Sequence, residues 1–165
     1  MTTASGERVL VRFTVASEPG NERLALAQVA EAVAGTGLTD DQLDRLKTAV
    51  AEATMNAIEH GNHNQADVPV DITVVDTGEG VAVSIVDQGG AHAPATAPEV
   101  ELPDLDKKLA GLQSPRGWGL FLIQNMVDAM DVSTDGDEHT VRLLMRTTWP
   151  PRPRDPKGGS RAEQM

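Results

Sequence analysis

The sequence contains no cysteine and no tyrosine, and aromatic side chains make up only 2% of its 165 residues. The absence of cysteine excludes disulfide bonds, thiolate metal sites and thiol catalysis. With so few aromatic residues, the core has to be built from aliphatic side chains and methionine. Apolar residues still reach 39% of the chain, which suits a globular protein of one domain.

Long apolar runs and positive charge are also scarce. No run approaches the ~18 residues of a membrane span, and residues 1–7 lack the pattern of a signal peptide. Fourteen Lys and Arg stand against 25 Asp and Glu, which gives a net charge of −11. Such a surface repels nucleic-acid phosphates at long range, although a local pocket can still hold a nucleotide. We therefore expect a cytoplasmic protein that binds no membrane and contacts no nucleic acid directly.

Hydrophobic spacing predicts the first half of the fold. Alternation over residues 9–15 predicts a strand, and helical spacing over residues 26–33 predicts a helix. Thr39 and Gln42 have the spacing of a capping box, which begins a second helix. We expect this helix to end with Gly61 as its C-cap.

The second half alternates in the same way. A hairpin is expected over residues 68–85 with its turn at 77–80. A third helix is expected from its apolar spacing, followed by a short strand near Val132 and a last strand over residues 141–145; the helix positions are Leu120, Ile123, Val127 and Met130. This order predicts an α+β two-layer sandwich, with a mixed, mainly antiparallel sheet and the helices on one face.

Composition also predicts how the chain is divided into a folded domain and flanking segments. Residues 1–8 are expected to be an N-terminal extension, and residues 9–148 the folded domain. The proline-rich stretch at about 90–116 is long for a loop and is expected to be a functional lid. Residues 149–165 are rich in Pro and Arg, with little apolar content, and are expected to be a disordered tail.

Three groups of residues stand out as candidates for chemistry, and the first lies on the second helix. Glu52, Asn56 and Glu59 share one helical stripe. The stripe could be an ordinary solvated face. It could also place an amide oxygen of Asn56 on Mg²⁺, with Glu52 one turn earlier as a base.

The other two groups involve glycine. Asp87 ends an apolar strand and Gly89 follows it, which is either an ordinary turn or a carboxylate that accepts from an exocyclic amine beside a close-approaching backbone. Residues 116–120 (RGWGL) precede an apolar helix. They are either a plain helix start or a phosphate site made of free N–H groups and the Arg116 guanidinium.

In their order and spacing, residues 52–61 (EATMNAIEHG), 87–89 (DQG) and 116–120 (RGWGL) resemble the N, G1 and G2 boxes of the GHKL superfamily, which has the Bergerat ATP-binding fold. The resemblance covers about residues 9–146. Within the superfamily the chain is most similar to the anti-sigma factor serine kinases, which are compact single domains.

This resemblance implies a role for each matched residue. Asn56 would hold Mg²⁺ between the phosphates of ATP, and Glu52 would be the catalytic base toward an acceptor serine. Asp87 would hydrogen-bond the adenine amino group, and Gly89 would line the adenine pocket. The phosphates would be cradled at the lid by Arg116, Gly117, Trp118, Gly119 and Leu120, with Thr140 near the adenine.

The resemblance also implies partners. Such a kinase sequesters a sigma factor, and it phosphorylates an anti-anti-sigma protein of the STAS type, which regulates transcription. A homodimer is expected on the same ground. Two alternatives stay open: an ATP-binding partner-switching module that titrates its partner without phosphorylating it, and a detached ATP-binding domain that serves a histidine kinase-like partner.

Overall fold

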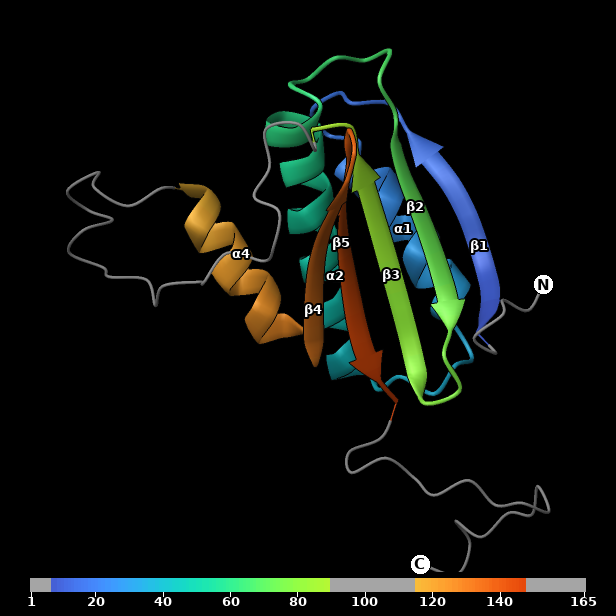
Figure 1. Cartoon of the computed structure of the whole chain (residues 1–165). Helices are drawn as coiled ribbons and strands as arrows, with labels where there is room; N and C mark the ends of the chain where they lie inside the picture. Colours follow the sequence, from blue (N-terminus) through green and yellow to red (C-terminus); the bar gives the residue numbers. More distant parts are fainter. Residues whose placement is uncertain (1–6, 90–114, 148–165) are drawn as a thin grey trace, which may run out of the picture.

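One antiparallel sheet of five strands organises the molecule, in the order β1-β2-β3-β5-β4 (Figure 1). The computed structural model describes residues 7–89 and 115–147, with the backbone only for 115–120. Most of the predicted lid and all of the predicted tail lie outside the described residues. The strands are β1 (Arg8–Val15), β2 (Val70–Asp76), β3 (Gly80–Asp87), β4 (Ala129–Asp135) and β5 (Glu138–Arg146).

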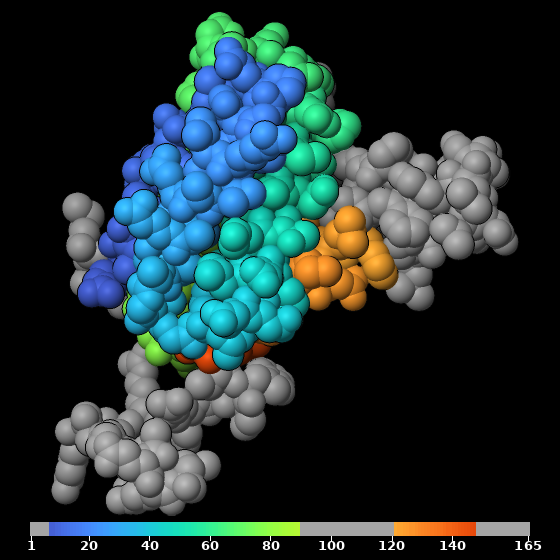
Figure 2. All heavy atoms as spheres, turned by 180° about the vertical axis from the view of Figure 1, so that it is seen from behind, coloured from blue at the N-terminus to red at the C-terminus, as the bar shows by residue number. Residues whose placement is uncertain are grey.

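The helices cover one face of this sheet (Figure 1). They are α1 (Glu22–Val33), α2 (Asp40–Asn56), the π-helical turn η1 (Ala57–Gly61) and α4 (Pro115–Met126). Seen from behind, α1 and α2 lie side by side, and the described part of α4 lies beside α2 (Figure 2). The expected two-layer α+β sandwich is confirmed. Every strand pair in the described part is antiparallel, so the expected mixed sheet is not found there.

Aliphatic side chains fill the space between the two layers, as the scarcity of aromatic residues requires. Alternate positions of β2, β3 and β5 point toward the helices and are buried. They meet the apolar faces of α1, α2 and α4. The core includes Val29, Leu46, Val50, Ile58, Val70, Ile72, Val74, Val81, Val83, Ile85, Ile123, Val141, Leu143 and Met145.

The second helix begins as predicted and ends differently. The Gln42 N–H donates to Thr39 Oγ1 at 3.1 Å, and the Thr39 N–H donates to Gln42 Oε1 at 3.0 Å, which completes the capping box. At the other end α2 widens into η1, and Asn62 rather than Gly61 is the C-cap. Gly61 does not have a positive φ, so the expected C-cap glycine was wrong.

The boundary between α4 and β4 was also predicted incorrectly. The helix ends at Met126, and Met130 lies in β4 opposite Leu143. The Asp128 N–H already donates to the Leu144 carbonyl at 2.9 Å, so pairing with β5 starts two residues after the helix. Apolar residues at 123, 127 and 130 fit helical spacing by coincidence, and strand pairing decided the structure.

Candidate functional site

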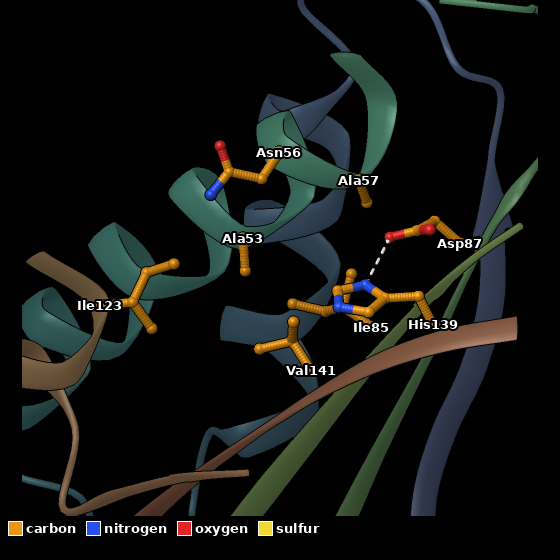
Figure 3. Close-up of a pocket in the computed structure, with 8 residues that line it drawn as sticks. All are labelled: Ala53, Asn56, Ala57, Ile85, Asp87, Ile123, His139 and Val141. Carbon is orange, nitrogen blue, oxygen red and sulfur yellow. Dashed lines mark hydrogen bonds and ion pairs between the residues drawn. The ribbon is translucent and has the colours of Figure 1, made fainter. Parts of the chain in front are cut away.

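A pocket lies where α2, η1 and α4 meet β3 and β5 (Figure 3). Most of its wall is aliphatic, and three polar side chains reach it from different elements. An apolar pocket with a few convergent polar groups is the usual form of a small-molecule site. The lining residues are Ala53, Asn56, Ala57, Ile85, Asp87, Ile123, His139 and Val141.

Asp87 is held at the end of β3 by strand alternation. Val83, Ile85 and Asp87 share the side that faces the helices, so the carboxylate follows apolar residues into the interior, and Asp87 as a whole residue is only 3% exposed. Its Oδ1 accepts from the Gly89 N–H at 2.8 Å, and its Oδ2 lies 3.1 Å from His139 Nδ1. A buried carboxylate is tolerated because it has such partners.

Gly61 and Gly89 form a cradle around this carboxylate. A Cβ on Gly61 would lie 2.2 Å from the carboxyl carbon of Asp87, and a Cβ on Gly89 would lie 2.7 Å from the Gly61 carbonyl oxygen. Both distances are too short for any side chain. The two glycines are therefore required by close approach, which brings the end of η1 against the segment that follows β3.

Asn62 holds these segments together through its side-chain hydrogen bonds, and the sequence did not lead us to predict this residue. Its side chain is buried; Oδ1 accepts from the Gln88 N–H at 2.8 Å, while Nδ2 donates to Ser17 Oγ at 2.9 Å and to the Val68 carbonyl at 3.2 Å. One amide thus joins the end of η1 to three other segments. An asparagine directly after a helix-ending glycine was the available signal.

Asn56 is the last residue of α2, at the point where the helix widens into η1. Its side chain is half-buried and lines the pocket, and its Nδ2 is buried without a hydrogen-bond partner in the described part of the chain. Such a group is destabilising in the empty protein. It is the donor that an oxygen-rich ligand would satisfy.

The other two residues of the predicted stripe, Glu52 and Glu59, do not line the pocket. Glu52 is half-buried one turn before Asn56 and does not line the pocket, while Glu59 is exposed on η1. No cluster of three or more His, Asp or Glu side chains suited to a metal ion occurs among the residues that the structure describes. No helix in that part is long and apolar enough to cross a membrane.

The predicted phosphate segment forms the beginning of α4. Pro115 takes the first helical position, where its missing N–H has no intrahelical partner to lose. Ile123, two turns into the helix, lines the pocket. The backbone alone is described for the five predicted residues Arg116, Gly117, Trp118, Gly119 and Leu120.

The structure places His139, and not Thr140, in the pocket. Along β5 the buried positions are 139, 141, 143 and 145, so Thr140 lies on the opposite face of the sheet. Thr140 is half-buried there, opposite Val86 and Ser133. Extending the apolar alternation of Val141 by one step toward the N-terminus would have identified His139.

The chain is similar to known proteins both in sequence and in fold. The family model described as a histidine kinase-like ATPase domain matches residues 15–145. An anti-sigma F factor from Clostridium beijerinckii is 31% identical to the chain, over 86% of it and 95% of the relative. Another from Geobacillus stearothermophilus is 29% identical, over 82% and 89%.

Solved structures share the fold at low identity. The RsbU and RsbW domains of a Mycobacterium tuberculosis protein align with a TM-score of 0.57 and 18% identity, over 82% of this chain and 32% of that one. The SiaB–SiaC complex from Pseudomonas aeruginosa aligns with a TM-score of 0.56 and 13% identity, over 84% and 90%.

Proposed function

Because the chain belongs to the family of histidine kinase-like ATPase domains and is similar to anti-sigma F factors, we propose that it is an anti-sigma factor with ATP-dependent serine kinase activity. It would sequester a sigma factor and phosphorylate a serine of an anti-anti-sigma protein of the STAS type. The observation that carries the proposal is the buried Asp87 at the end of an apolar pocket, beside the Gly61–Gly89 cradle.

The chemistry of the pocket's lining suits the base of ATP. Its aliphatic wall can cover a flat ring, and the Asp87 carboxylate is a hydrogen-bond acceptor at its polar end. An exocyclic amine, such as that of adenine, is the matching donor. The acceptor selects for the amine because a carbonyl oxygen at the same place would face a carboxylate with no hydrogen between them.

The phosphates would lie between the end of α2 and the beginning of α4. Asn56 offers amide oxygen and nitrogen there, and its unpartnered Nδ2 fits a ligand rich in oxygen. Mg²⁺ would take the amide oxygen together with phosphate oxygens, and would neutralise charge on them. The first N–H groups of α4 and the Arg116 side chain would bind the remaining phosphate oxygens.

Transfer would use Glu52 as the base. The acceptor serine oxygen forms a bond to the γ-phosphorus while the bond from that phosphorus to the β–γ bridging oxygen breaks, and ADP leaves. The serine proton passes to the Glu52 carboxylate. Glu52 lies one helical turn from Asn56, which puts the base close to the proposed phosphate site without making it part of the base pocket.

One observation favours a second function. Glu52 is absent from the residues that line the pocket, so a partner-switching module that binds ATP and titrates its partner without phosphorylating it also fits the described residues. The two functions share the nucleotide site and differ only in transfer. Glu52 is therefore the residue that separates them.

Two measurements test the proposal. Calorimetric titration with Mg-ATP is expected to show binding by the wild type and by Asp131→Asn, an exposed carboxylate on β4, and at least tenfold weaker binding by Asp87→Asn. Phosphate transfer to a cognate serine protein is expected to yield an acid-stable product. Glu52→Gln should abolish transfer and keep ATP binding, while Glu31→Gln, exposed on α1, should change neither.

A wild type that binds no adenine nucleotide would overturn the nucleotide site itself. Binding without transfer by the wild type would establish the partner-switching module instead. An acid-labile phosphoprotein would indicate transfer to histidine, as expected of a domain that serves a histidine kinase-like partner.

A further inference from the structure

His139 and Asp87 form a buried polar pair on neighbouring central strands. They stand directly opposite each other in the register of β3 and β5, and direct cross-strand neighbours have their side chains on the same face. Their side chains are 7% and 4% exposed, with Nδ1 of the imidazole 3.1 Å from Oδ2 of the carboxylate. Both enter the pocket, and the second ring nitrogen lies on the side of the ring away from Asp87 (Figure 3).

The contact favours a proton on the ring nitrogen that faces the carboxylate. An ionised carboxylate only accepts hydrogen bonds, so the nitrogen that faces it, Nδ1, has to be the donor. The other oxygen, Oδ1, accepts from the Gly89 N–H at 2.8 Å. The carboxylate is therefore held from two directions, by the loop that follows its own strand and by the neighbouring strand.

Such a pair is unusual for a position in the core. Val141, Leu143 and Met145 continue the same face of β5, and all three are buried and apolar. A buried imidazole at the start of this row needs a polar partner, and Asp87 provides it. The pair lies beside the pocket, at the end of this series of apolar residues, where a ligand would contact the carboxylate.

We propose that His139 is a positioning residue for nucleobase recognition: it donates from Nδ1 to Asp87 Oδ2 and so holds the carboxylate in the orientation that receives the exocyclic amine of the base. This inference rests on the proposed nucleotide site. Without the imidazole, Oδ2 of a buried carboxylate loses its donor, and only the Gly89 N–H on Oδ1 still limits rotation about the last side-chain bond. The remaining lone pairs then no longer have a fixed direction.

Three substitutions separate positioning through Nδ1 from other roles. His139→Ala removes the donor and is expected to weaken Mg-ATP binding roughly 10- to 100-fold, the range for losing a hydrogen bond to a charged group. His139→Asn puts an amide N–H where Nδ1 lies, and is expected to restore affinity to within a few fold of the wild type. His139→Gln puts its amide near Nε2 instead, and should bind as weakly as alanine.

Calorimetry with Mg-ATP measures the affinities, and thermal unfolding without nucleotide shows that each variant is folded. Ser133→Ala, exposed on the adjacent β4, is the control and should bind like the wild type. If His139→Ala does not fold, the comparison of Asn with Gln decides the question alone.

The inference is overturned if His139→Ala binds as tightly as the wild type or more tightly, because the imidazole then only occupies space. It is also overturned if Gln restores binding and Asn does not, because Nε2 would then be the important atom. These results leave the nucleotide site standing, whereas a wild type that binds no ATP removes both proposals.

Discussion

Replacing Asn56 by alanine is expected to make the nucleotide-free protein more stable and its Mg-ATP binding weaker. The side-chain nitrogen of Asn56 is buried and has no partner in the described part of the chain, inside a helix that alanine favours more than asparagine does. Stability and binding therefore move in opposite directions. A residue on an ordinary solvated helix face would change neither by much.

The magnitude follows from three contributions. An unsatisfied buried amide costs about 1–3 kcal/mol, and helix propensity adds about 0.5 kcal/mol in favour of alanine. Lost contacts of the half-buried side chain offset about 1 kcal/mol of this gain. The net gain of about 0.5–2.5 kcal/mol corresponds to a rise in the unfolding midpoint of about 1–10 °C for a chain of this size.

Thr54→Val is the matched control. Thr54 is fully buried on the same helix, and its Oγ1 also has no partner among the described residues, yet it does not line the pocket. The valine variant should also be stabilised, with unchanged nucleotide binding. Thermal unfolding and calorimetry with ATP, with and without Mg²⁺, measure both properties. A less stable Asn56→Ala variant, or one that keeps its Mg²⁺-dependent binding, would refute the reasoning.

Three further substitutions test the architecture of the site. Gly61→Ala should destabilise the fold by about 2–3 kcal/mol in urea unfolding and abolish ATP binding, since its Cβ would meet the Asp87 carboxyl carbon at 2.2 Å; near-normal stability would contradict the cradle. Asn62→Ala leaves the Gln88 N–H without its acceptor and should cost about 2–4 kcal/mol in the same assay, and a loss under 1 kcal/mol would contradict its role as a lock. Thr140→Val should leave calorimetric ATP affinity within twofold, because the side chain lies on the opposite face of the sheet; a larger loss would return Thr140 to the site.

Local patterns in the sequence predicted the local structure well. The Thr39 capping box and the turn at residues 77–80 depend on neighbours in the chain, and both were predicted correctly. The α4–β4 boundary was not, because Met130 fits a helical and a strand pattern equally well. Its pairing with Leu143 depends on β5, which no local pattern contains.

The residues of the site fall into the same two groups: those that a local motif identifies, and those whose role depends on a distant partner. Asn56, Asp87 and Gly89 could be named from motifs, and the structure brings them together around one pocket or its rim. His139 and Asn62 were not named: a local pattern marks each position, but the role of each depends on a partner far away in the sequence. Gly61 was named for the wrong reason: its small size matters for Asp87, and no special backbone angle is involved.

The order of the strands has a consequence for how the molecule folds. β2 and β3 form one hairpin before the 90–114 segment, and β4 and β5 form another after it, while β1 pairs with β2 and β3 pairs with β5 across long separations in sequence. Joining β1 to β2 closes a loop over residues 16–69, and joining β3 to β5 closes one over residues 88–137. Contacts that close such long loops form slowly. We therefore expect the β2–β3 and β4–β5 hairpins to form early, and the β1–β2 and β3–β5 pairs to form late. Because His139 contacts Asp87 across the β3–β5 pair, we expect that a chain still emerging from the ribosome binds no nucleotide until β5 is made.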